Sequence, residues 1–174
     1  LTCTTHTYNG MRPYMKDDIG TVGSALLCDE LYTELICDGV HVSIPAVKFL
    51  YKNKPSHNIV LISDALRTKG MPNGIYEELE QKIILKDKEA RLEDGTLAGS
   101  VLKLNEAIKN FMDFTGSNFE DAVKCATENP AKNLSSPKLP SRMPKHLTYD
   151  QSIQLLQLAG QGKYAERDFC IITL

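Results

Sequence analysis

Asn58-Ile-Val-Leu-Ile-Ser-Asp64-Ala65 is the stretch of sequence that decides the fold. Four consecutive apolar residues, mostly β-branched, are typical of a strand that is buried on both faces in a parallel sheet. Asp64 would then lie at the carboxyl end of this strand. In barrels and open sheets of alternating strands and helices, functional sites are assembled at that end. A lone Asp there is more often a helix cap or a turn residue, so support for a site has to come from other strands.

Two further strand ends carry histidines. Thr5-His6-Thr-Tyr8-Asn9-Gly10 places His6 at the end of a short strand, before an Asn-Gly turn. A second buried strand is predicted over residues 35–42, and it contains Asp38-Gly-Val-His41. Each gap between the three strands is long enough for one crossover helix. Right-handed crossovers would place the three carboxyl ends on one edge of a parallel sheet.

His6, His41 and Asp64 would then converge on one site. Imidazole is a ligand for zinc-like metals, and a nearby carboxylate can take a proton from water held by the metal. These residue types are those of a hydrolytic metal site, although three unrelated polar residues remain the simpler interpretation of the spacing alone.

Capping residues and periodic apolar residues predict the helices that cover this sheet. A short helix is expected over residues 19–27, and Ser43 would cap a second helix with Pro45 in its first turn. An apolar stripe predicts a helix after residue 102. Asn118 would cap a further helix, which we expect Asn129-Pro130 to end.

The segment between the third strand and these last helices predicts a hairpin and a loop. Residues 81–86 and 90–92 flank Asp87-Lys-Glu and would form the hairpin. Residues 93–100 are mostly small and polar, which predicts a loop. That loop is either a plain turn with a helix cap or a backbone surface that a ligand can approach, since glycine leaves no side chain in the way.

Composition bounds the class of protein. A net charge of -2 over 174 residues gives no reason to expect nucleic acid or an acidic membrane as partner. No apolar segment approaches the ~20 residues of a membrane span. The five cysteines form no C-x-x-C pair, and their odd number argues against a secreted disulfide framework. We therefore expect a soluble, cytoplasmic protein with reduced thiols.

Five motifs in order carry a resemblance to a known family. The chain resembles the N-acetylglucosamine-6-phosphate deacetylases of the amidohydrolase superfamily over residues 4–134. The motifs are Thr5-His-Thr-Tyr-Asn9-Gly-Met, Asp38-Gly-Val-His41-Val, Ile62-Ser-Asp64-Ala, Leu92-Glu-Asp-Gly-Thr-Leu-Ala-Gly-Ser100 and Ala126-Thr-Glu-Asn-Pro130-Ala.

The resemblance implies an α/β fold, specifically the C-terminal part of a metal-dependent (β/α)8 barrel. Residues 1–134 would hold the last three barrel strands and the helices that follow them. Residues 135–174 would be a divergent tail that opens with three prolines in ten residues; a remnant of the family's small β domain is one interpretation of it. The full-length form would be a homodimer.

The resemblance also implies the chemistry, which is hydrolysis of the acetamide of N-acetylglucosamine 6-phosphate to glucosamine 6-phosphate and acetate. A divalent metal ion, with zinc expected, would be held by His6 together with a Glu and a His from earlier strands. Asp64 would be the catalytic acid and base, and a neutral His41 would donate a hydrogen bond to the substrate. The substrate-contacting positions would be Asn9, Gly10, Asp38, Gly39, Val40, His41, Leu97, Ala98 and Gly99.

Two departures from the family pattern leave an alternative open. The chain has Met15-Lys-Asp-Asp-Ile-Gly20 where the family has a His-His-Arg-Glu-Pro-Gly segment, so Asp17 stands where an Arg contacts the substrate phosphate. Like charges would repel there. The tail also lacks the family's closing pattern. The alternative is a non-catalytic, truncated or decayed half barrel that acts as a folding or interaction module.

Overall fold

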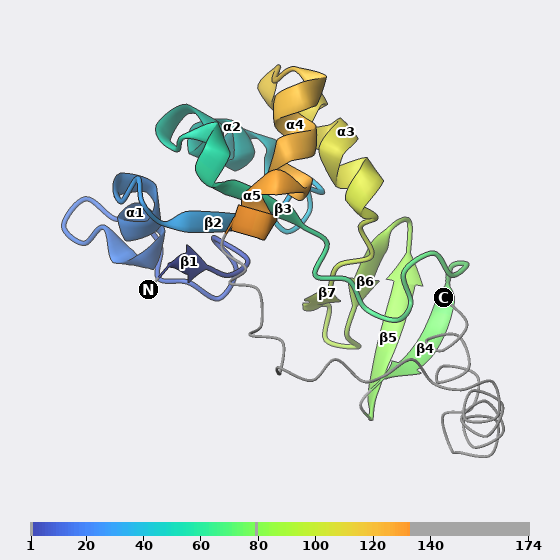
Figure 1. Ribbon diagram of the computed structural model, residues 1–174. Coiled ribbons are helices and arrows are strands. Elements are labelled where there is room, and N and C mark those ends of the chain that lie inside the picture. The colour runs from blue at the N-terminus through green and yellow to red at the C-terminus, as the bar shows by residue number, and fades with distance from the viewer. Residues whose placement is uncertain (1, 79, 133–174) are drawn as a thin grey trace, which may run out of the picture. The chain divides into compact units, whose positions relative to one another are not determined.

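The computed structural model describes residues 2–78 and 80–132, so the predictions for the tail at 135–174 lie outside the described residues. The described chain contains a parallel sheet covered by helices and a separate antiparallel sheet (Figure 1). The parallel sheet has the order β1-β2-β3, with β1 at Cys3–Thr4, β2 at Tyr32–Ile36 and β3 at Ile59–Ile62.

The parallel sheet confirms the three predicted strands and their order. Thr4 pairs with Thr33, and Ile36 pairs with Ile62. The second strand was predicted over residues 35–42, but β2 begins earlier and ends at Ile36. It ends there because the Asp38 carboxylate accepts hydrogen bonds from the next amides along the chain and closes a tight turn.

The crossover helices are confirmed. They are α1 at Gly20–Leu27 and α2 at Ile44–Asn53. The hydroxyl of Ser43 accepts a hydrogen bond from the Ala46 amide at 3.4 Å, and Pro45 lies in the first turn of α2, where its missing N–H costs nothing.

The later helices are α3 at Leu104–Thr115, α4 at Phe119–Ala126 and α5 at Glu128–Lys132. The Asn118 side chain caps α4, accepting from the Asp121 amide at 2.9 Å as predicted. The predicted stop at Asn129-Pro130 is wrong, because α4 ends at Ala126 and Pro130 lies in the first turn of α5. Asn129 instead donates to the carbonyl of Ile59 at 2.8 Å and ties α5 to β3.

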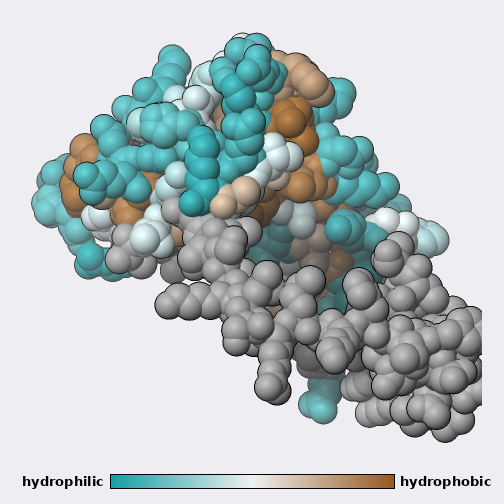
Figure 2. Space-filling model, in the orientation of Figure 1, coloured by the Kyte–Doolittle hydropathy of each residue, from teal (hydrophilic) through white to brown (hydrophobic). Residues whose placement is uncertain are grey.

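The main core lies between the parallel sheet and its helices. Its largest fully buried side chains include Leu35, Leu50, Ile59 and Phe111. Figure 2 shows that hydrophilic side chains cover much of the helical surface, with hydrophobic patches showing through. None of the helices in the described ranges is long and apolar enough to cross a membrane.

The antiparallel sheet is larger than predicted. The predicted hairpin is confirmed as β5 at Gln81–Lys86 and β6 at Glu89–Arg91. It has an additional strand on each side, β4 at Gly74–Glu78 and β7 at Leu97–Gly99, in the order β4-β5-β6-β7. Residues 93–100 were predicted as a loop, yet Leu97–Gly99 pairs with β6. Ile83, Leu85 and Ala90 form a small core of its own.

Candidate functional site at the carboxyl ends of the parallel strands

Each of the three parallel strands ends two residues before a polar side chain that the sequence pattern marks as a site candidate. His6 follows β1, Asp38 follows β2 and Asp64 follows β3. Because Ile36 pairs with Ile62 in a parallel register, Asp38 and Asp64 leave the sheet at the same level. The predicted shared edge of the sheet is therefore present.

His6 lies in a tight loop that is fastened to the neighbouring strand. The amide of Thr7 donates to the carbonyl of Glu34 at 2.8 Å, which holds the loop against β2. The Nδ1 atom of His6 is 2.9 Å from the carbonyl oxygen of Asn9, and a Cβ on Gly10 would lie 4.0 Å from the His6 ring. When Nδ1 donates to that carbonyl, Nε2 is the nitrogen left to bind a metal ion.

Asp38 and His41 form a nearly buried pair, and their side chains are 13% and 10% exposed. One carboxylate oxygen of Asp38 accepts from the amides of Val40 and His41, both at 2.8 Å. The other oxygen is 2.7 Å from Nδ1 of His41. Burial alone raises the pKa of Asp38, but the hydrogen bonds from the His41 ring and from the two amides outweigh burial and hold this pKa below its usual value.

Asp64 is brought beside the segment that contains Leu97, Ala98 and Gly99. The carbonyl of Asp64 accepts from the amide of Ser100 at 3.2 Å, and Ala65 forms a parallel bridge with Ser100. A Cβ on Gly99 would lie only 3.0 Å from the side chain of Leu66, so a larger residue does not fit there without a shift. The residue that the resemblance assigns to catalysis and one segment that it assigns to the substrate are thus direct neighbours.

The described part of the chain does not form a complete metal site by itself. Within residues 2–78 and 80–132, no three His, Cys, Asp or Glu side chains lie close enough together to hold a metal ion. The hypothesis from strand spacing, in which His6, His41 and Asp64 form a hydrolytic metal site together, is therefore not supported as a ligand group.

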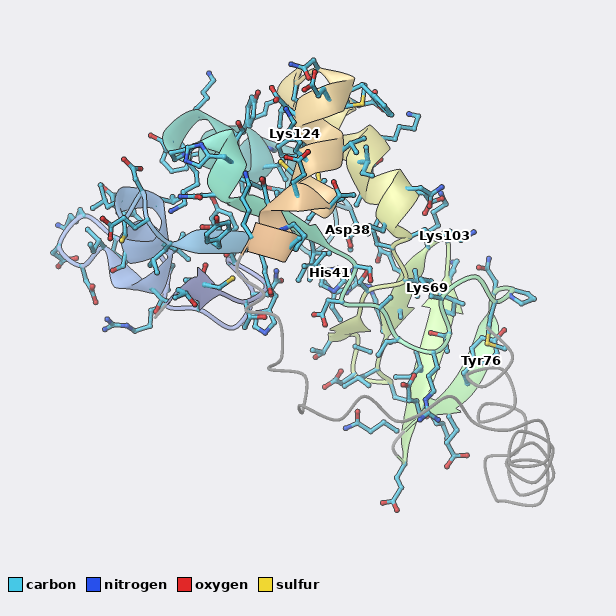
Figure 3. All side chains as sticks on the ribbon, viewed as in Figure 1. Asp38, His41, Lys69, Tyr76, Lys103 and Lys124 are labelled. Carbon is cyan, nitrogen blue, oxygen red and sulfur yellow. The ribbon has the colours of Figure 1, made fainter. Side chains whose placement is uncertain are left out.

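A cleft of about 550 Å³, which the sequence did not predict, opens beside Asp38 and Val40. Lys88, Lys103 and Lys109 are among its other lining residues. Two of these lysines are already paired, Lys88 with Glu106 and Lys109 with Asp113. Figure 3 shows Asp38 and His41 close together, with Lys103 at the start of α3. No sequence signal marked these lysines, because the antiparallel sheet and α3 bring them together from distant positions.

Known proteins with similar sequences are deacetylases named for amino-sugar phosphates. The N-acetylglucosamine-6-phosphate deacetylase of Bacillus subtilis (strain 168) is 41% identical over 130 residues, which is 75% of this chain and 33% of that protein. The N-acetylgalactosamine-6-phosphate deacetylase of Escherichia coli O157:H7 is 32% identical over 165 residues, which is 92% of this chain and 44% of that protein. No protein-family model matches.

Solved structures give the same result. The crystal structure of N-acetylglucosamine-6-phosphate deacetylase from Thermotoga maritima has a TM-score of 0.72 and 40% identity, and the similarity covers 75% of this chain and 36% of that one.

The fold and the polar residues after its parallel strands place the chain in the α/β class. Proteins of this class commonly carry their functional sites at the carboxyl edge of a parallel sheet. Within that class, the chain belongs to the N-acetylglucosamine-6-phosphate deacetylase family, whose members are hydrolases. It spans about a third of the length of the first curated relatives it matches.

Proposed function

We propose that this chain is the C-terminal portion of a (β/α)8-barrel enzyme that hydrolyses the acetamide of N-acetylglucosamine 6-phosphate to glucosamine 6-phosphate and acetate. The observation that carries this proposal is the shared sheet edge, where His6, Asp38 and Asp64 each follow a parallel strand by two residues. The 41% identity to the Bacillus subtilis deacetylase over 130 residues supports it.

In this proposal the chain supplies one ligand to a divalent metal ion, with zinc expected. His6 fits that role, because the contact of Nδ1 with the Asn9 carbonyl orients the ring and leaves Nε2 as the ligand atom. A catalytic zinc usually has three protein ligands, so the others would come from residues outside this chain. When bound, the ion would lower the pKa of water and polarise the acetamide carbonyl.

Asp64 would carry the proton of the reaction. Its carboxylate is exposed at the sheet edge, and its backbone is anchored to Ser100. It would take a proton from the attacking water and return it to the leaving amine. The substrate would lie between the His6 loop, the Asp38 loop and β7, touching Asn9, Gly10, Asp38, Gly39, Val40, His41, Leu97, Ala98 and Gly99.

A second candidate substrate is N-acetylgalactosamine 6-phosphate. It is favoured because the relative from Escherichia coli O157:H7 that is named for this substrate matches 92% of the chain, including part of the segment after residue 134. Four other expectations from the sequence also stay predictions. They are the alternative of a non-catalytic half barrel, a homodimer of the full-length form, a cytoplasmic location and a division of the chain at residue 134.

A graft into a full-length relative tests the proposed function. Residues 2–132 would replace the matching portion of the Bacillus subtilis deacetylase, and acetate release would be measured with both amino-sugar phosphates. We expect the chimera to hydrolyse N-acetylglucosamine 6-phosphate and to need the same metal ion for this as the parent enzyme. A folded, metal-loaded chimera that releases no acetate would contradict the proposal. A preference for the galactosamine substrate would favour the second candidate, because the rest of the chimera comes from a glucosamine-named relative.

A further inference from the structure

Asp38 makes one more hydrogen bond than its turn requires. The two amide contacts at 2.8 Å, from Val40 and His41, already close the turn after β2. The second oxygen makes an additional contact of 2.7 Å with Nδ1 of His41. Gly39, with φ at +79°, allows the chain to fold back far enough for this contact.

We propose that Asp38 is a positioning residue that keeps the proton of the His41 ring on Nδ1, so that Nε2 offers a lone pair to the substrate. The proposal follows from what each group can do chemically. An ionised carboxylate only accepts hydrogen bonds, so the nitrogen that faces it must carry the proton. In a neutral imidazole the other nitrogen is then an acceptor.

The surroundings of the pair favour the ionised carboxylate. Two backbone amides and the imidazole all donate to Asp38, and these donors hold its pKa below the usual value in spite of burial. A separation of 2.7 Å is typical of a hydrogen bond with an ionised partner. Because both side chains are nearly buried, water competes little for the contact.

In this proposal a neutral His41 accepts a hydrogen bond from the substrate, whereas the sequence-based expectation is that it donates one. Of the two ring nitrogens of His41, Nδ1 has a recorded hydrogen-bond partner within the described residues, and Nε2 has none there. A lone pair at Nε2 matches the donors of an amino sugar, namely its hydroxyl groups and its amide N–H, and it does not match phosphate oxygens. The inference rests on the proposed function for the identity of the substrate alone, since the position of the proton is a property of the chain itself.

Nitrogen NMR of the uniformly labelled 174-residue chain tests the proposal. In mildly alkaline solution, where a free imidazole is neutral, we expect His41 to show a protonated Nδ1 and an unprotonated Nε2. Comparison with His41→Gln assigns the signals. In Asp38→Asn the amide oxygen can still accept from the backbone, so the amide nitrogen would face Nδ1 and the proton should move to Nε2. The same Asp-to-Asn change in the serine protease triad leaves the geometry intact but gives the wrong tautomer.

The matched control is Asp113→Asn, which makes the same chemical change at an exposed carboxylate on α3. It should leave both nitrogen shifts of His41 unchanged. A wild-type ring with its proton on Nε2, or with both nitrogens protonated, would overturn the proposal. The wild-type spectrum decides the question even where Asp38→Asn does not fold. Neither result depends on whether the protein deacetylates a sugar, so failure of this inference and failure of the proposed function are distinguishable.

Discussion

Two of the proposed site residues have backbone conformations that residues other than glycine seldom adopt. The φ angle of Asp64 is +45° and that of His6 is +32°. Such conformations cost of order 1–3 kcal/mol each and cluster at functional sites. The chain thus retains local strain where the proposed chemistry takes place, as expected if position matters more than stability at these residues.

Asp64→Asn in the chimera tests the role of this carboxylate directly. The amide has the same shape but cannot accept a proton, so we expect turnover to fall by ~10²–10⁴-fold, the usual contribution of a general base. Metal content, measured by elemental analysis, should stay at the parent level because Asp64 is not a proposed ligand. Turnover near that of the unmodified chimera would remove Asp64 from the mechanism.

Asp17 is expected to weaken recognition of the substrate phosphate. It is exposed in the segment before α1, and the nearby cation of Arg12 is already paired with Asp18 at 3.1 Å. Asp17→Arg in the chimera should lower KM for the 6-phosphate substrate, because an Arg–phosphate pair is a strong, often bidentate contact. The control is Asp113→Arg on α3. An unchanged or higher KM would mean that the phosphate lies elsewhere or already has its cation.

Among the helices, α1 depends on a side chain from another element for its C-terminal end. Lys54, which is only 3% exposed, donates to the carbonyl of Ala25 at 2.9 Å and to that of Cys28. These carbonyls lie at the end of α1, where the helix supplies no partner of its own. The lysine therefore fixes α1 against the segment that follows α2.

Lys54→Met should lower the free energy of unfolding by about 1–3 kcal/mol, the cost of leaving buried carbonyls without a donor. Urea denaturation of the chain measures this change. Lys52→Met, at an exposed position in the last turn of α2, is the matched control and should change stability by less than about 0.5 kcal/mol. Equal effects of the two substitutions would show that the carbonyl contacts contribute little.

Some elements could be predicted from sequence and others could not, for physical reasons. Runs of buried apolar residues and side-chain caps are local signals, so β3, α2 and the start of α4 were found. β4 and β7 were missed although each pairs with a strand that is close to it in sequence, because their half-exposed side chains give only a weak apolar pattern. Ile75 in β4, for example, is 70% exposed. The end of β2 was misplaced because Asp38 closes its turn with a side chain, which the apolar pattern does not reveal.

The candidate site was predictable to a similar extent. The strand ends predicted a shared edge with His6, His41 and Asp64. That edge is present, but β2 ends earlier than predicted, so Asp38 is the residue that follows it by two positions. The cleft could not be foreseen, because it depends on how α3 and the antiparallel sheet are placed. The metal site that strand spacing predicted is not formed, since no three His, Cys, Asp or Glu side chains lie together within residues 2–78 and 80–132.

For the whole molecule, two buried thiols predict a loss of stability in alkali. Burial raises the pKa of Cys37 to about 12 from the ordinary thiol value of 9.0, with a further contribution from the Asp38 charge, and burial does the same for Cys125. Above pH 9 the unfolded chain loses these protons while the folded chain keeps them, so stability should fall with rising pH. The slope is about 1.4 kcal/mol per pH unit for each thiol.

Urea denaturation at pH values on either side of 9 measures this slope. The variant Cys37→Ala/Cys125→Ala should show a shallower decline than the wild type, whereas Cys28→Ala, at an exposed thiol, should not. Identical slopes in all three proteins would mean that the buried thiols do not stay protonated in the folded state.

The most direct test of the central claim, that this chain holds one part of a deacetylase site, compares the isolated chain with the chimera. Both would be incubated with Zn²⁺ and N-acetylglucosamine 6-phosphate, and bound metal and released acetate would be measured side by side. Because one imidazole cannot hold a catalytic zinc, the account predicts no stoichiometric metal and no acetate above background from the isolated chain, and both from the chimera. Tight stoichiometric metal and measurable turnover in the isolated chain would contradict it.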